Sequence, residues 1–79
     1  MTEIKQKVLN TMSDVFEMDV ADIPENAAPG VIENWDSIRH MNLVVALEEE
    51  FDIRFNDVDI ADLITITLIE SIIKEMKSV

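Results

Sequence analysis

The residues that interrupt regular structure are confined to one short stretch of this chain. Pro24, Pro29 and Gly30 are its only prolines and its only glycine. Because proline cannot continue a helix and glycine favours turns, this stretch predicts a connection between helices. The connection should extend over residues 18–35, and a loop this long must be held by apolar anchors. The expected anchors are Val20, Ile23, Val31, Ile32 and Trp35.

Apolar residues recur at spacings of three and four on both sides of this loop, which predicts amphipathic helices. The first helix should cover residues 2–16 with Thr2 as its N-cap, and the second should run from Asp36 or Ser37 to about residue 50. A short helix over residues 57–62 or 57–63 and a last helix over residues 65–77 should follow. The predicted fold is therefore all-α, a four-helix bundle with three long helices, one short helix and a long first loop.

The expected core combines one apolar stripe from each long helix with the end of the short one. Its predicted members are Val8, Met12, Phe16, Met41, Val44, Leu47, Phe51, Leu63, Ile66 and Ile69. Leu43 should flank the stripe of the second helix, and Val45 should be exposed. In the short helix, the apolar side is expected to comprise Val58, Ile60, Ala61 and Leu63.

Length and charge limit the classes of function. The chain has 79 residues, enough for one domain, and its 17 acidic and 6 basic residues give a formal net charge of −11. Such a surface repels nucleic acids and anionic membranes and attracts basic protein surfaces. There is no cysteine, no apolar run near the roughly 18 residues that span a bilayer, and no signal-peptide pattern. We therefore expect a cytoplasmic monomer with no nucleic-acid partner and no membrane insertion.

One hydroxyl group is distinguished by its position at a predicted helix start. Asp36 is suited to be the N-cap of the second helix, so Ser37 should lie in the first turn, at the surface. A phosphate ester on Ser37 would lie where backbone N–H groups and the helix dipole favour negative charge. An Asp-Ser pair alone is common, but the residues from Trp35 to Phe51 around it make this pair informative.

The chain resembles the acyl carrier proteins over nearly its whole length. The shared pattern is a helix, a long loop, Asp-Ser at the second helix, a stretch of the type LVVALEEEF at residues 43–51, a short helix and a closing helix. The resemblance implies that Ser37 carries a 4′-phosphopantetheine arm and that a phosphopantetheinyl transferase reads Asp36 beside it. It also implies that the chain is no enzyme. It would carry acyl groups as thioesters between partner enzymes of a fatty-acid, lipid or secondary-metabolite pathway.

Several residues of the second helix depart from the family pattern. Ile38 replaces a common leucine, and Arg39 and Asn42 stand at commonly acidic positions. Because mismatched contacts contribute to the rejection of wrong partners, we expect a carrier of a specialised pathway. Its partners would be acyl-activating, acyltransferase or ketosynthase-type enzymes with basic surfaces. The predicted partner-binding residues are Ile38, Arg39, Asn42, Val45, Glu48 and Glu49.

Two other functions fit the same residues. One is an aminoacyl or peptidyl carrier of the D-alanyl type, and the other is an acidic helical interaction module without a prosthetic group. His40 is expected to be an ordinary polar residue of the helix surface, and Trp35 should pack on the loop and fix its geometry. Leu68 and Ile69 are large where the family often has small residues, which predicts less interior space and a short or polar cargo.

No metal site is predicted. Asp57, Asp59 and Asp62 suggest a calcium loop, but the required glycine and glutamate are missing from the sixth and twelfth positions of an EF-hand pattern, which are Asp62 and Leu68 here.

Overall fold

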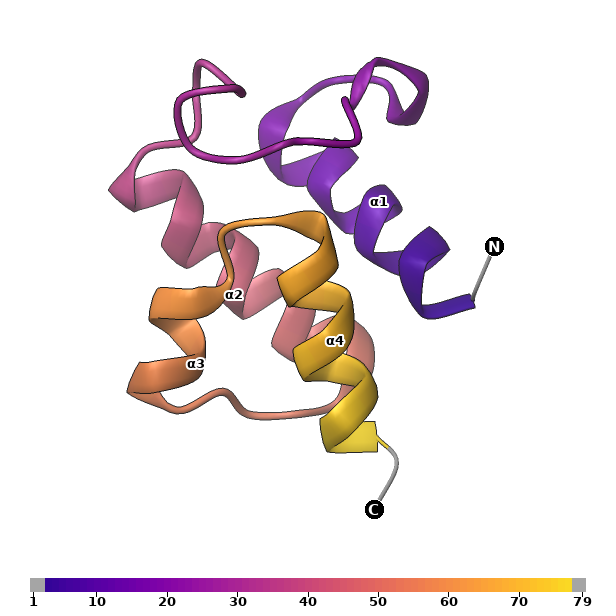
Figure 1. The fold of residues 1–79 in the computed structure, drawn as a ribbon, viewed down its shortest axis with the longest axis vertical. Coiled ribbons are helices and arrows are strands. Elements are labelled where there is room, and N and C mark those ends of the chain that lie inside the picture. Colours follow the sequence, from indigo (N-terminus) through magenta and orange to yellow (C-terminus); the bar gives the residue numbers. More distant parts are fainter. Residues whose placement is uncertain (1–2, 78–79) are drawn as a thin grey trace.

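The computed structural model describes residues 3–77, which form helices joined by loops, with no strand in that range (Figure 1). The elements are α1 (Glu3–Phe16), the 3-10 helix η1 (Val20–Asp22), α2 (Ser37–Phe51), α3 (Asp57–Asp62) and α4 (Ile66–Lys77). The predicted all-α fold with four helices and a long first loop is confirmed. The four predicted helices begin and end within one residue of the observed ones, whereas η1 was not predicted. Thr2, the predicted N-cap of α1, lies outside the described residues.

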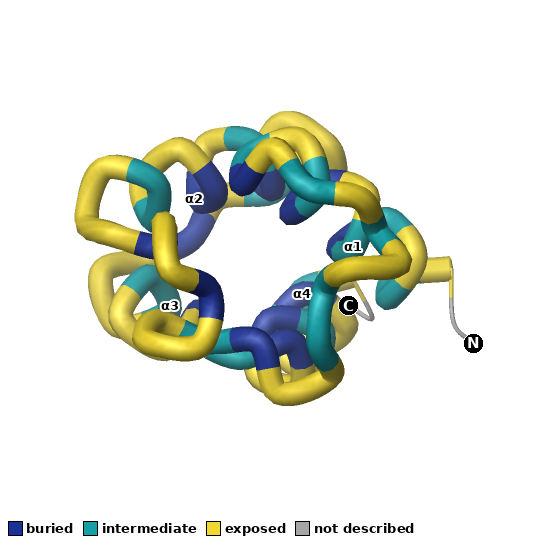
Figure 2. The backbone as a smooth tube through the Cα atoms, turned by 90° about the horizontal axis from the view of Figure 1, so that it is seen from above, coloured by how far each residue is buried: buried dark blue, intermediate teal, exposed yellow. Residues whose placement is uncertain are grey.

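The helices surround one apolar core, with the long loop covering one end of the molecule (Figure 1). α1 packs against both α2 and α4, and α3 packs against α4. Seen from above, the buried segments turn toward the middle of the molecule and the exposed segments lie outside (Figure 2). The buried apolar residues are Val8, Met12, Phe16, Ala27, Ile32, Trp35, Leu43, Val44, Leu47, Phe51, Phe55, Leu63, Ile66, Ile69 and Ile73.

The inward face of α2 is as predicted at Val44, Leu47 and Phe51 but differs in the turn before them. Met41, predicted to be in the core, is 49% exposed, whereas Leu43, predicted only to flank the core, is fully buried. In this turn it is His40 that faces the interior. It is half-buried and lies on the same side of the helix as Val44 and Leu47. A polar residue therefore holds the core-facing position that an apolar pattern assigned to Met41. Val45 is 49% exposed, as predicted.

The loop is held by fewer anchors than predicted. Of the five expected anchors, Ile32 and Trp35 are buried. Val20 and Ile23 are half-buried, and Val31 is exposed. The prediction for Val31 was wrong, because its side chain is 48% exposed. Ala27, which was not predicted, is fully buried, and its N–H donates to the carbonyl oxygen of Pro24 in a turn. Gly30 has φ of +95°, in agreement with its predicted place in a turn.

The last two helices confirm the predicted core only in part. Ile66 and Ile69 of α4 are buried as predicted, and so is Leu63 directly after α3. Other predicted positions were wrong: Val58 is 70% exposed, Ala61 is also exposed, and Leu68 is 40% exposed and so does not reduce the interior space. A helix of six residues offers too few turns to bury a whole apolar side, and here mainly its C-terminal end reaches the core.

α1 and α2 both end on a residue in the left-handed conformation. Glu17 after α1 and Asp52 after α2 each have φ of 54°. The next N–H, of Met18 or Ile53, donates to a carbonyl oxygen five residues earlier, at 3.1 Å in both helices. This is the Schellman arrangement, which is usually made by glycine. It exposes the last carbonyl groups of α1 toward the start of α2.

Candidate functional site

Ser37 is the first residue of α2 and is exposed, as predicted. Asp36 before it is the N-cap: its Oδ1 atom accepts a hydrogen bond from the N–H of Arg39 at 2.8 Å, and its carbonyl oxygen accepts one from the N–H of His40 at 2.8 Å. The N–H groups of Ser37 and Ile38 have no partner within the helix, because a helix leaves its first N–H groups unpaired. Two N–H donors and the positive end of the helix dipole therefore lie beside the Ser37 hydroxyl.

A surface hollow of about 490 Å³ opens next to Ser37. Its wall is formed by the loop, the first turns of α2, and α3 with the connection to α4. The lining residues are Pro29, Trp35, Asp36, Ser37, His40, Met41, Ala61 and Ile64. Most of them are apolar or aromatic, so the hollow can receive an apolar group that is attached close to Ser37.

Trp35 and His40 connect the loop, α2 and α3 at the bottom of this site. Trp35 Nε1 donates to His40 Nδ1 at 3.1 Å, and His40 Nε2 lies 2.8 Å from the carbonyl oxygen of Ile60. Trp35 is 6% exposed, and its ring packs on Phe16 of α1, with 4.9 Å between ring centroids. The predicted role of Trp35 in fixing the loop agrees with these contacts. The prediction for His40 was wrong, because its ring is a structural connection between helices.

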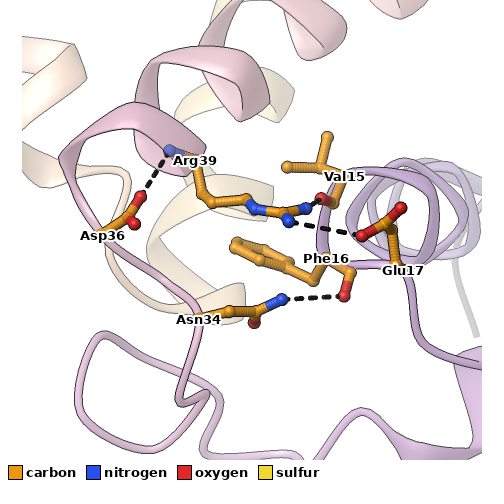
Figure 3. Close-up of polar contacts among 6 residues, drawn as sticks. All are labelled: Val15, Phe16, Glu17, Asn34, Asp36 and Arg39. Atoms are coloured by element: carbon orange, nitrogen blue, oxygen red, sulfur yellow. Dashed lines mark hydrogen bonds and ion pairs between the residues drawn. The ribbon is translucent and has the colours of Figure 1, made fainter.

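Arg39 and Asn34 attach the start of α2 to the end of α1 (Figure 3). Asn34 Nδ2 donates to the carbonyl oxygen of Phe16 at 3.1 Å, and Arg39 Nη1 donates to that of Val15. Arg39 Nη2 also lies 3.3 Å from Glu17 Oε2. The guanidinium and amide groups thus satisfy carbonyl groups that the end of a helix leaves unpaired. We call this set of contacts the α1 latch.

The six predicted partner-binding residues divide into two groups. The side chains of Arg39 and Glu48 are used inside the molecule, the first in the α1 latch and the second as the acceptor for the Phe55 N–H at 2.9 Å. The remaining four side chains are exposed and directed outward: Ile38, Asn42, Val45 and Glu49.

The predicted residues around Ser37 are thus brought together, whereas two of the six side chains predicted to bind partners make contacts within the molecule. Asn34 and Met41 belong to the site but were not assigned to it from the sequence. For Asn34, the available signal was its position beside the predicted loop anchor Trp35 and two residues before the predicted N-cap Asp36. For Met41, the signal was its distance of four residues from Ser37, which places both on one side of a helix.

Other kinds of site receive no support from the described part of the chain. Within residues 3–77, no group of three or more His, Cys, Asp or Glu side chains is arranged to hold a metal ion. The Asp59 carboxylate serves the N-terminus of α3, where it accepts from the Asn56 N–H in a capping box. None of the helices in that range is both long and apolar enough to cross a membrane.

Searches against known protein families and against curated protein sequences gave no match.

Proposed function

We propose that this chain is a carrier of acyl groups, held as thioesters on a 4′-phosphopantetheine arm that is attached to Ser37. The observation that carries the proposal is the position of one exposed hydroxyl at the first residue of the 15-residue helix α2, beside an apolar hollow. The stretch from Trp35 to Phe51 that resembles the acyl carrier proteins contains this hydroxyl and most of the residues that hold it.

The surroundings of Ser37 fit a phosphodiester. Such a group has one negative charge, and the N–H groups of Ser37 and Ile38 at the helix start can donate to its oxygens. The nearest acid in sequence is Asp36, whose carboxylate is already turned to the Arg39 N–H. The site can therefore accept the charge without a change of the helix, and Asp36 remains available on the surface for recognition by the transferase.

When bound, the arm would supply the thiol that a chain without cysteine lacks. The residues of the chain would hold and present the attached group rather than react with it. His40, the only histidine, supports this division, because both of its ring nitrogens are used in contacts to Trp35 and Ile60. In this proposal the bond-making steps belong to partner enzymes, and the chain is no enzyme.

The proposed partners are a phosphopantetheinyl transferase and enzymes that load or receive acyl groups, of the acyl-activating, acyltransferase or ketosynthase type. The uncommon residues of α2, notably Arg39 and Asn42, favour a specialised pathway over bulk fatty-acid synthesis. The carrier would act as a cytoplasmic monomer.

The test is modification by a broad-specificity phosphopantetheinyl transferase with coenzyme A, followed by intact-mass spectrometry. The wild-type chain should gain the mass of one phosphopantetheinyl group. Ser37→Ala should gain nothing and should keep its circular-dichroism spectrum. Ser71→Ala is the matched control, because Ser71 is an exposed serine of α4 and should not affect labelling. An unchanged mass of the folded wild-type chain would leave only an acidic helical interaction module.

A further inference from the structure

Residues 37–47 of α2 are almost free of charge, although the chain has a net charge of −11. Within residues 37–47, Arg39 is the only side chain with a formal charge, with histidine counted as neutral. Its guanidinium is directed to α1 and pairs with Glu17 at 3.3 Å. The next acid along the helix, Glu48, accepts a hydrogen bond from the Phe55 N–H. The exposed carboxylate beside Ser37 is therefore that of the N-cap Asp36, and the exposed side chains that follow it up to residue 47 have no negative charge.

This face is apolar as well as uncharged. Ile38, Met41 and Val45 follow each other at spacings of three and four, so they lie on one side of α2. Their side chains are 74%, 49% and 49% exposed. Met41 also lines the hollow beside Ser37, so the apolar surface continues into the hollow. We call Ile38, Met41 and Val45 the apolar stripe.

We propose that the enzyme that modifies Ser37 docks on the apolar stripe with an apolar surface, and not with the basic surface that the net charge of the chain would suggest. This inference rests on the proposed function. An enzyme that reaches Ser37 must cover the start of α2, and typical contacts bury about 800 Å² per partner. Val45 lies eight residues after Ser37, about 12 Å along the helix axis, and so falls within such a contact.

The apolar stripe favours a partner with an apolar surface. Burial of apolar side chains against an apolar surface is favourable, whereas a cation buried at the centre of the stripe would lose water and find no carboxylate among residues 37–47. Exposed acids follow only at the far end of the helix, at Glu49 and Glu50. The partner should thus be apolar where it covers the stripe and have cations only at its two edges, near Asp36 and near these two acids.

A second copy of the chain is a poorer occupant of the stripe. Two chains with a net charge of −11 each repel one another, and this repulsion opposes association through a small apolar face. A different protein with an apolar centre and a few peripheral cations meets no such repulsion.

The test substitutes Val45 by side chains of opposite charge and measures the transferase reaction at saturating coenzyme A. Val45→Glu and Val45→Lys should both raise the KM for the carrier about five- to tenfold, because either charge must be buried against an apolar surface. The kcat should stay near the wild-type value, because Ser37 and its surroundings are unchanged. Circular dichroism and Trp35 fluorescence establish that both variants are folded.

Val31→Glu and Val31→Lys are the matched controls. Val31 is a valine of similar exposure, 48%, but it lies on the loop, where it lines a different hollow from the one beside Ser37. These variants report the effect of total charge on the encounter, which should change KM by less than about twofold.

Three results would overturn the proposal. If Val45→Glu leaves KM unchanged or lowers it while Val45→Lys raises it, the docking surface is basic. If neither variant changes KM, the enzyme does not use this face. If the wild-type chain forms a dimer in sedimentation experiments and both Val45 variants abolish it, the stripe is covered by a second copy. In all three cases Ser37 is still modified, so the proposed function stands, whereas a wild-type chain that takes up no phosphopantetheine removes both proposals together.

Discussion

His40 is a polar residue at a position of α2 that faces the interior. Its Nδ1 atom accepts from Trp35 and its Nε2 atom lies against the Ile60 carbonyl oxygen, so the ring must have its hydrogen on Nε2. This arrangement turns His40 inward and leaves Met41 at the surface. An apolar pattern predicts the opposite, because it gives a histidine no reason to face the interior.

Replacement of His40 by alanine should lower the free energy of unfolding by about 2 kcal/mol. Two hydrogen bonds are lost, and the buried Trp35 N–H remains without a partner. Urea denaturation followed by circular dichroism measures the change, and NMR at about pH 8 should find the Nε2–H tautomer of the ring in the wild-type chain.

Trp35→Phe provides the control for this prediction. In a double-mutant cycle, Trp35→Phe and His40→Ala should be less destabilising together than the sum of their separate effects, by about 1 kcal/mol. Strict additivity of the two effects, or a ring with its hydrogen on Nδ1, would contradict the proposed contact.

Asp36 has two proposed roles that different substitutions can separate. Asp36→Ala removes the N-cap and should lower the free energy of unfolding by about 1 kcal/mol. Asp36→Asn keeps a capping oxygen and should lower it by only a few tenths of a kcal/mol. If the transferase reads the negative charge, Asp36→Asn should be folded like the wild type but modified more slowly. Equal rates of modification for Asp36→Asn and wild type would restrict Asp36 to the capping role.

At the scale of elements, the α1 latch sets the position of α2 relative to α1. Asn34→Ala and Arg39→Ala should each lower the free energy of unfolding by about 1 kcal/mol, since each leaves a carbonyl group of α1 without its donor. The exposed residues Asn42 and Arg54 provide matched controls, and their alanine variants should change stability by less than about 0.5 kcal/mol. Latch variants as stable as these controls would show that the contacts do not hold the helices.

The latch also changes how partner choice can be tested. An acidic residue at position 39 would lose the bond to Val15 and would face Glu17, so its effect on a partner could not be separated from its effect on the fold. Position 42 is exposed and suits this purpose better.

Helix periodicity was enough to predict the elements and most of the buried side of the long helices, but not the exposure of Met41 and Val58. The breaks at Pro24, Pro29 and Gly30 and the regular apolar spacing placed all four helices within one residue of their observed ends. Contacts between elements that are far apart in the chain were not predictable, such as that of Arg39 with Val15, because they depend on how the helices pack. At the candidate site, the cap by Asp36 and the exposure of Ser37 followed from local rules, whereas the roles of Asn34 and His40 did not.

At the scale of the whole molecule, the net charge of −11 opposes the compact state through self-repulsion. An increase of NaCl from about 0.01 M to about 0.1 M shortens the Debye length from about 30 Å to about 10 Å. The melting temperature should then rise by about 4–8 °C, which corresponds to about 1 kcal/mol for a chain of this size. Thermal melts by circular dichroism measure this shift, with a neutral osmolyte as control. An unchanged melting temperature would show that the acids are too far apart to matter.

The central claim is that Ser37 bears a phosphopantetheine arm, and the most direct measurement is the intact mass of the protein isolated from its own cells, with peptide mapping. We expect a mass increased by one phosphopantetheinyl group, with or without an acyl cargo, located on the peptide that contains Ser37. A Ser37 peptide that is entirely unmodified in the folded protein from those cells would contradict the claim.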